Sequence, residues 1–336
     1  MPALTLNIAL LTGSAVVIYL ACEFFVNGVE WVGQKMSLGS KATGTILAAF
    51  GTALPESIVT LIAVAFGTGA ASKELGVGAA LGGPLALSTI AYATVGLTLI
   101  ACGRRLAPTP AMREDLRHLS RDQAWFLLVF AAKIGLGLVV FAWKPWLGIG
   151  FLAAYALYVR QEMKSGLDVE EEALEPLKIQ PGKEEPSGAM AALQTLIALI
   201  VIFLASRSFV GQLELLGPAL GLKPQLLALL FSPIATELPE TMNAIIWVRQ
   251  GKYRLALANI TGAMMIQATI PTAFGLFFTP WHLSTPLLIA AGATMVAIAV
   301  MFALFRRGIA TRGALASMAG LYILFAGTLI LLHITG

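Results

Sequence analysis

The seven residues TALPESI at positions 52–58 recur as TELPETM at positions 236–242, and both copies lie inside long apolar stretches. Each copy places a glutamate, Glu56 or Glu240, where the surrounding sequence is hydrocarbon. An ionised group at membrane depth is costly, and it is retained mainly where it faces a cavity or a partner. The two glutamates therefore predict a functional site to which both halves of the chain contribute.

The register of the two motifs extends beyond them. With the same offset and no gap, matching residues occur throughout the preceding segments, and Glu30 falls on Glu214. Apolar residues recur by chance in any membrane protein, but paired glutamates and paired Leu-Pro-Glu strings do not. A duplicated half-protein is the simplest explanation, with halves at residues 1–160 and 188–336 joined by a hydrophilic linker at 161–187.

The composition indicates an all-α integral membrane protein. Hydrophobic residues make up 58% of the chain, charged residues 12%, and the mean hydropathy is +0.83, whereas an average soluble domain carries about 25% charged residues. A helix needs about 20 apolar residues to span a bilayer. Ten candidate spans lie at 5–30, 41–66, 76–101, 124–143, 145–160, 188–209, 222–248, 254–279, 284–305 and 315–334. The N-terminus lacks the basic region of a cleavable signal, so we expect the first segment to remain as a span.

Ten spans divide into five per half, and an odd number per half makes the second half enter the membrane from the opposite face. The sequence thus predicts ten transmembrane helices as two inverted five-helix repeats, with broken helices near the midplane. This pattern is typical of alternating-access transporters, which bind their substrate where the two halves meet.

Basic residues predict the orientation. Seventeen loop bases follow the odd-numbered spans, and only Lys73, Lys144 and Lys223 lie on the opposite side. By the positive-inside rule, both termini lie outside a cell membrane and the 161–187 linker is cytoplasmic. The basic excess is therefore a topology signal and indicates no nucleic-acid partner. The linker is charged and free of aromatic residues, so we expect it to be disordered.

The repeated motif carries the oxygen ligands that a hard cation requires. Proline at 55 and 239 removes a backbone donor, so we expect each helix to kink or unwind around Gly51–Pro55 and Ala235–Pro239 and to free main-chain carbonyls. Thr52 and Thr236 precede the glutamates by four residues, which places them on the same helix face. Calcium favours six to eight oxygen ligands of these kinds. The alternative is a purely structural kink whose glutamate pairs locally.

Two bases lie at membrane depth, Lys133 in the fourth span and Arg207 in the sixth. Arg207 falls on the repeat position of Glu23, so either these two residues pair or Arg207 extends to the membrane interface. Lys133 either pairs with a site carboxylate or has a structural role, which we favour. The two cysteines, Cys22 and Cys102, are isolated and form no metal motif or disulfide framework.

The chain resembles the sodium/calcium exchanger branch of the calcium:cation antiporters. That family carries two inverted repeats, each with a G-T-S-L-P-E-like segment followed by a G-N-x-x-G-S-N-I-x-N-like segment on the next helix. The first segment is similar to GTALPE at 51–56 and ATELPE at 235–240. The resemblance implies that Glu56 and Glu240 are the central cation ligands and that Thr52 and Thr236 supply flanking oxygens.

The second segment departs from the family pattern in both halves. In ANITGAMMIQ at 258–267, Ala263 takes the position of the serine and Gln267 that of the final Asn or Asp. In GAALGGPLAL at 78–87, Gly83 replaces the serine and Leu87 the asparagine, with Ser88 adjacent.

The first segment also departs, because Ala53 and Glu237 stand where serine is usual. Three glutamates can then converge, and carboxylates crowded in a low-dielectric site favour a shared proton. The candidate cation ligands are therefore Glu56, Glu240, Thr52, Thr236, Glu237 and Gln267.

The leading hypothesis is a secondary cation antiporter that exports Ca²⁺ in exchange for Na⁺ or H⁺, with no cofactor and with inorganic cations and membrane lipid as its partners. One alternative is an antiporter of Na⁺ or another monovalent cation against H⁺. Another is a membrane scaffold or sensor that binds an ion without moving it. An enzyme is disfavoured, because the chain has no H-E-x-x-H or G-x-S-x-G motif.

Overall fold

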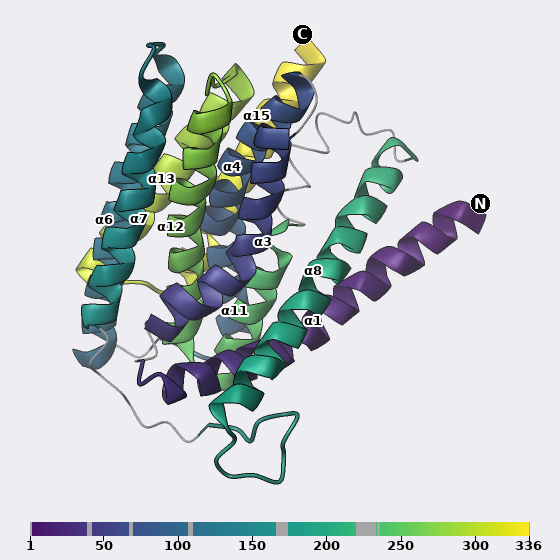
Figure 1. Cartoon of the computed structure of the whole chain (residues 1–336), viewed down its shortest axis with the longest axis vertical. Coiled ribbons are helices and arrows are strands. Elements are labelled where there is room, and N and C mark those ends of the chain that lie inside the picture. Colours follow the sequence, from purple (N-terminus) through teal and green to yellow (C-terminus); the bar gives the residue numbers. More distant parts are fainter. Residues whose placement is uncertain are drawn as a thin grey trace.

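The structure is a computed structural model, and it describes residues 2–38, 42–66, 70–106, 110–165, 174–219, 233 and 236–335. Within these ranges every regular element is a helix (Figure 1). The first half contains α1 (Pro2–Lys35), η1 (Thr43–Ala48), α3 (Ala49–Leu61), η2 (Ile62–Phe66), α4 (Ala70–Ala86), η3 (Leu87–Ala91), α5 (Tyr92–Ala101), α6 (Pro110–Leu138), η4 (Lys144–Trp146) and α7 (Leu147–Ser165). The second half contains α8 (Gly188–Ala219), α11 (Leu238–Gln250), α12 (Tyr253–Phe278), α13 (Thr285–Arg307), α14 (Arg312–Ala316) and α15 (Met318–Thr335).

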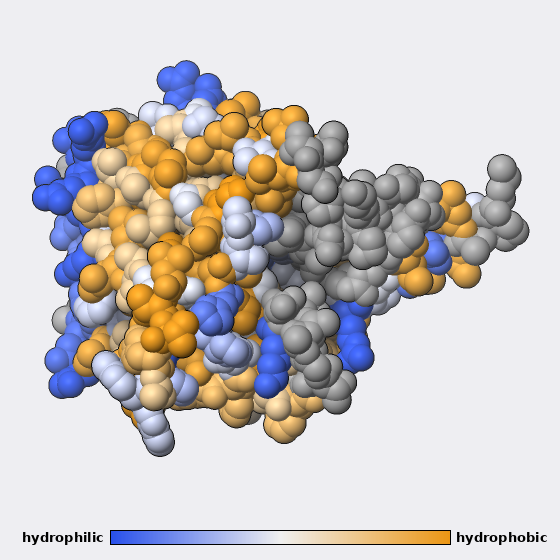
Figure 2. Space-filling view, turned by 90° about the horizontal axis from the view of Figure 1, so that it is seen from above, coloured by the Kyte–Doolittle hydropathy of each residue, from blue (hydrophilic) through white to orange (hydrophobic). Residues whose placement is uncertain are grey.

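The prediction of an all-helical membrane protein is confirmed in its general form. Six helices of the described chain are long and apolar enough to cross a bilayer, at 4–35, 76–101, 188–209, 253–278, 285–307 and 312–332. The other four predicted spans are largely helical where they are described, except that residues 139–143 and Glu237 lie outside the helices. Hydrophobic residues are seen over much of the face viewed from above (Figure 2). The helices also expose many large hydrophobic side chains, such as Leu128, Leu196 and Ile323, which is typical of lipid-facing helices.

Helix α12 lies at the centre of the fold. Of its most apolar stretch, 83% is buried inside the protein, compared with 22% for α1. It packs against α3, α4, α6, α7 and α11, and it can approach η1 closely because Gly262 has no side chain to collide with the backbone of Thr45. The second-motif helix of the second half is thus enclosed by helices from both halves.

Helices α1 and α8, which open the two halves, form a separate pair (Figure 1). They pack along each other, with the Ser14 hydroxyl 3.1 Å from that of Ser208. At Gly28 the contact is close, because a Cβ there would lie 2.6 Å from Thr195 Oγ1. The pair meets the rest of the protein mainly through contact of α1 with α11.

The prediction of a broken helix holds in the second motif but is wrong for the backbone of the first. Glu237 is non-helical, with φ −88° and ψ 12°, and α11 begins directly after it with Pro239 in its first turn. In the first half, α3 runs through Pro55 without a break, and π-helical segments flank it instead. The Thr52 hydroxyl donates to the Ala48 carbonyl at 3.1 Å.

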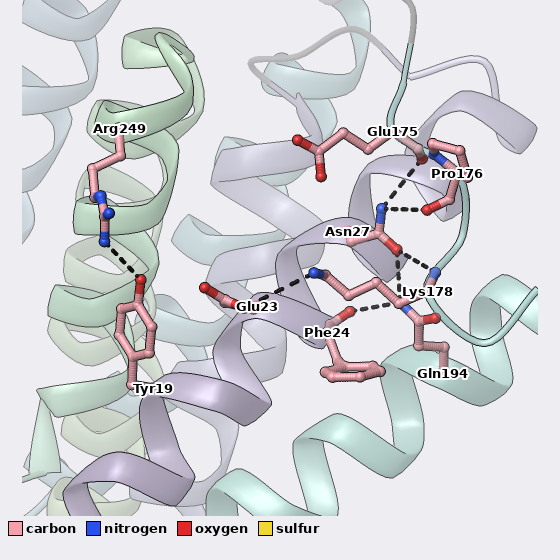
Figure 3. Close-up of polar contacts among 9 residues, drawn as sticks. All are labelled: Tyr19, Glu23, Phe24, Asn27, Glu175, Pro176, Lys178, Gln194 and Arg249. Carbon is pink, nitrogen blue, oxygen red and sulfur yellow. Dashed lines mark hydrogen bonds and ion pairs between the residues drawn. The ribbon is translucent and has the colours of Figure 1, made fainter. Parts of the chain in front are cut away.

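The prediction of a disordered linker is wrong for residues 174–187, which are ordered and pack on α1 and α8 (Figure 3). The Asn27 carboxamide donates to the carbonyls of Glu175 and Pro176, both at 3.3 Å, and accepts from the Lys178 amide at 3.1 Å. Trp31 Nε1 donates to the same Glu175 carbonyl at 2.9 Å. The composition argument failed because partners on the helices, and not a core of its own, order the segment.

Helix α8 and apolar packing complete this contact, which we call the linker clamp (residues 174–180 on α1 and α8). Gln194 of α8 accepts from the Ile179 amide at 3.0 Å and donates to Asn27 Oδ1 at 2.9 Å. Leu177 is fully buried in a cluster with Trp31 and Ala191. The clamp thus joins the C-terminal part of α1 and the N-terminal part of α8 to the segment that connects the halves.

The clamp also decides between the two alternatives for Arg207. Glu23, the residue at its repeat position, pairs with Lys178 of the linker at 3.9 Å (Figure 3). Arg207 is exposed on α8. The Glu23–Arg207 pairing is therefore absent from the described contacts, and the exposed position of Arg207 fits the alternative in which its side chain extends toward the membrane interface.

We predict that Asn27→Ala releases the linker clamp. The amides of Lys178 and Ile179 should then exchange hydrogen for deuterium at least about tenfold faster, because opening of this segment would no longer break buried hydrogen bonds. Hydrogen-exchange mass spectrometry of the purified protein measures this rate. Glu184→Gln, at an exposed site of the same linker, is the matched control and should leave the rate unchanged. Equal rates in Asn27→Ala and wild type would contradict the assignment.

Candidate cation site

Glu237 and Gln267 form the best-defined contact among the predicted ligands. Glu237 immediately precedes α11, Gln267 lies on α12, and both side chains are buried. Gln267 Nε2 donates to Glu237 Oε1 at 2.6 Å. Both residues depart from the family pattern: Glu237 replaces a serine, and Gln267 replaces an Asn or Asp. The two replacements are therefore in direct contact with each other.

Gly83 of α4 lies against this pair. A Cβ at position 83 would lie 2.8 Å from Glu237 Oε1 and even closer to Gln267 Oε1, separations that side chains do not tolerate. The family serine at this position would therefore collide with the longer side chains. Gly83, Glu237 and Gln267 form one complementary arrangement, in which a glycine on one half makes room for a carboxylate and an amide of the other.

Glu240 lies in the first turn of α11 and is buried. The amino end of a helix carries partial positive charge, which favours a carboxylate at that position. Thr236, one residue before Glu237, is half-buried, and its hydroxyl donates to the Pro233 carbonyl at 3.2 Å. The second copy of the motif thus brings Glu240, Glu237 and Thr236 together at one end of α11.

In the first copy, Thr52 is buried on α3, which packs against α11 and α12. The hydroxyls of Thr52 and Thr236 both donate to main-chain carbonyls, so the lone pairs of each oxygen remain available to a cation. The backbone of Glu56 belongs to α3, but its side chain lies outside the described residues. Its convergence with Glu240 therefore stays a prediction.

The sequence argument missed two buried carboxamides, Asn243 and Asn259. Asn243 lies one turn after Glu240 on α11, Asn259 lies on α12, and both are fully buried. In the described part of the chain, neither side chain has a hydrogen-bond partner. A buried amide without a partner is unusual, and its oxygen can serve as a neutral ligand to a hard cation. The sequence could have indicated Asn243, because it lies three residues after Glu240 and therefore on the same face of the helix.

The described ligands are oxygens of mixed kind. The described side chains contain no group of three or more His, Cys, Asp or Glu that could hold a metal ion. Carboxylate, amide and hydroxyl oxygens are typical of sites for Ca²⁺ or Na⁺ and differ from the nitrogen and sulfur sets that select transition metals. The site therefore suits a hard cation.

Glu30, the other repeated glutamate, has partners of its own at the far end of α11. Trp247 Nε1 donates to Glu30 Oε1 at 2.8 Å, and Lys252 pairs with Glu30 Oε2. These contacts join α1 to the α11–α12 turn. Glu30 is therefore a structural contact between the α1–α8 pair and the core, while the side chain of Glu214 lies outside the described residues.

The sequence of the chain matches the family described as "Sodium/calcium exchanger protein" over residues 6–161 and 190–331. The chain belongs to the sodium/calcium exchanger protein family. The two matched segments correspond to the two halves predicted from the repeat, and they exclude the clamped linker. The family consists of transporters, so the chain is not an enzyme.

Two curated relatives match over most of their length. An uncharacterized membrane protein of Methanocaldococcus jannaschii is 23% identical over 266 residues, which is 78% of this chain and 79% of the relative. The inner membrane protein YrbG of Escherichia coli is 25% identical over 300 residues, 88% and 86% of the two chains.

The fold is similar to that of the sodium-calcium exchanger NCX_Mj. In its structure soaked with 10 mM Na⁺ the TM-score is 0.73 at 18% identity, and the match covers 96% of this chain and 98% of that chain. The structure soaked without Na⁺ or Ca²⁺ gives the same TM-score at 17% identity. This similarity shows a shared fold.

We predict that Gly83→Ala destabilises the protein by about 1–3 kcal/mol, the usual cost of inserting a methyl group into a packed core. The added Cβ would overlap Glu237 and Gln267. Gly135→Ala on α6, where no atom lies within 4 Å of the added Cβ, is the matched control. Thermal unfolding of both variants in detergent tests this. Equal unfolding temperatures would show that Gly83 does not pack against the pair.

Proposed function

We propose that the protein is a secondary active antiporter that exports Ca²⁺ across the cell membrane in exchange for Na⁺ or H⁺. The observation that carries this proposal is the burial of Glu240, Glu237 and Gln267 together at the α11–α12 contact. Buried acids in a membrane protein of the exchanger family require a counter-charge, and a transported cation supplies it. Membership of the family supports cations as the substrates.

In this proposal the cation is held between the two copies of the motif. Glu56 and Glu240 supply charge, and Thr52, Thr236 and freed carbonyls supply neutral oxygens. Glu237 and Gln267 complete one side of the site, and Gln267 limits Glu237 to one geometry through its hydrogen bond. The α1–α8 pair, which packs separately from the core, would move to expose the site to one side of the membrane at a time.

The proposed topology is ten spans in two inverted five-helix repeats, with both termini outside and the linker in the cytoplasm. The arrangement in Figure 1 supports it, since both termini lie toward one end of the molecule and the described linker residues lie at the other. The basic residues Arg104, Lys252 and Arg254 belong to the same side as the linker in this scheme. They contact Val248, Glu30 and Asp115 respectively.

A second candidate function is exchange of Na⁺ or another monovalent cation for H⁺. The Glu237–Gln267 contact favours it, because Glu237 already accepts a hydrogen bond and offers fewer free oxygens to a divalent ion. Leu87 at the family asparagine position removes a further oxygen ligand. Ca²⁺ remains the leading substrate because Asn243 and Asn259 add buried amide oxygens near the same helices.

Flux of radioactive calcium into inside-out vesicles tests the proposal, first under an imposed sodium gradient and then under a proton gradient. We predict uptake under one of the two gradients.

We also predict that Glu56→Gln and Glu240→Gln each abolish this calcium uptake while the protein remains folded and inserted, because each removes a charge that offsets the cation. Glu185→Gln in the exposed linker is the control. Wild-type flux in either site variant would contradict the shared site, and no flux under both gradients would favour the monovalent exchanger.

Cysteine labelling from outside the cell tests the topology. In a background without Cys22 and Cys102, we predict that a membrane-impermeant maleimide labels a cysteine at Gly336 and not one at Ser187. The reason is the seventeen-to-three distribution of loop bases between the two sides. Labelling after the cells are permeabilised is the control for reactivity. The reverse pattern would overturn the orientation.

A further inference from the structure

Lys133 places a positive charge in the interior of the membrane part of the protein. It lies on α6 within the predicted fourth span, and its side chain is fully buried. A charged side chain at this depth is expensive and is usually kept for function. Replacing a buried charge by an apolar residue is often neutral or stabilising, so packing alone does not account for a lysine here.

The contacts of Lys133 are main-chain oxygens and aromatic rings. Its Nζ donates to the Ala80 carbonyl at 2.6 Å and to the Gln267 carbonyl at 3.4 Å. The ring centroids of Phe130 and Trp281 lie 5.0 Å and 5.9 Å from Nζ, within range of cation–π attraction. Among the described carboxylates, none forms an ion pair with it.

Both carbonyls belong to the helices that build the cation site. Ala80 lies one turn before Gly83 on α4, and Gln267 on α12 donates to Glu237. A single residue, Gln267, therefore contacts both the buried amine of Lys133 and the buried carboxylate of Glu237. Its main-chain carbonyl faces Lys133, and its side-chain amide faces Glu237.

This arrangement performs two tasks. The ammonium joins α4 to α12 at the level where Gly83 packs on Glu237 and Gln267. The ammonium is also linked to the carboxylate of Glu237 through one residue, Gln267, which contacts both. Charge–charge interactions act over such distances in a low-dielectric interior, without direct contact.

We propose that Lys133 is a positioning and specificity-determining residue of the cation site, which holds Gln267 in place and offsets the charge of Glu237. The inference rests on the proposed cation site. Offsetting one carboxylate lowers the net negative charge that a cargo must neutralise. The presence of Lys133 therefore shifts the preference of the site from divalent toward monovalent cations.

The test compares Lys133→Met, Lys133→Arg and the double variant Lys133→Met/Glu237→Gln, using the purified full chain. Isothermal titration gives the Kd of each variant for Na⁺ and for Ca²⁺ at one pH. We expect the ratio of the Na⁺ Kd to the Ca²⁺ Kd to rise on the order of tenfold in Lys133→Met, because an added negative charge attracts a divalent ion more strongly. In the double variant and in Lys133→Arg the ratio should return to within about threefold of wild type, because the charge balance is restored.

A structural role alone predicts a different result. Lys133→Met would then weaken both cations equally, leave the ratio unchanged and gain nothing from Glu237→Gln. That outcome overturns the proposal. So does a Lys133→Arg variant whose ratio matches that of Lys133→Met.

Thermal unfolding without added cation provides a readout that does not depend on cation binding. We expect Glu237→Gln to raise the unfolding temperature more in the Lys133→Met background than in wild type, because it removes an uncompensated charge. If the wild type binds neither cation, the proposed function fails while this coupling still tests the Lys133–Glu237 relation. If Lys133→Met does not fold, folding of the double variant supports the proposal, and its failure to fold overturns it.

Discussion

The structure depends on the cost of holding carboxylates away from water. In the membrane interior an acid needs hydrogen-bond donors, a helix terminus or a cation. Glu237 and Glu240 have the first two: Glu237 accepts from Gln267, and Glu240 lies in the first turn of α11. These needs explain the local features around the site. A helix begins next to Glu237, a glycine at position 83 leaves room for Glu237 and Gln267, and a transported cation would complete the charge balance.

The rest of the fold is arranged around that requirement. Helix α12 is enclosed because it carries Gln267 and Asn259 into the site. Lys133 reaches the same level from α6 and meets main-chain oxygens of α4 and α12. Helices α1 and α8 pack mainly on each other, and Glu30, Trp247 and Lys252 connect them to the core at one end. The proposed exposure of one site to two sides in turn would use such a division between a core and a separate helix pair.

Several expectations from the sequence failed for reasons that lie in tertiary contacts. The linker has the composition of a disordered segment, yet Asn27, Trp31 and Gln194 bond its backbone and bury Leu177. Helix α3 continues through Pro55, with π-helical segments on either side of it. Of the two alternatives left open for Arg207, pairing with Glu23 is absent from the described contacts, because Glu23 pairs with Lys178 of the linker. Each outcome depends on which segment lies nearby, and sequence spacing does not encode that.

The sequence by itself determined the helical membrane class, the duplicated halves, the family and the position of the motif residues. Periodicity, hydropathy and repeated residues are local properties, and the cost of a charge in hydrocarbon makes Glu56 and Glu240 stand out in any fold. Only the tertiary structure decided that Gln267 donates a hydrogen bond to Glu237 and that Gly83 makes room for both. It also decided that Lys133 donates to the main-chain carbonyl of Gln267. These residues come from α4, α6, α12 and the residue that precedes α11, so both halves of the chain contribute them. Their contact depends on the packing of α4, α6 and α12, where side-chain volume and charge are matched only after the helices have assembled.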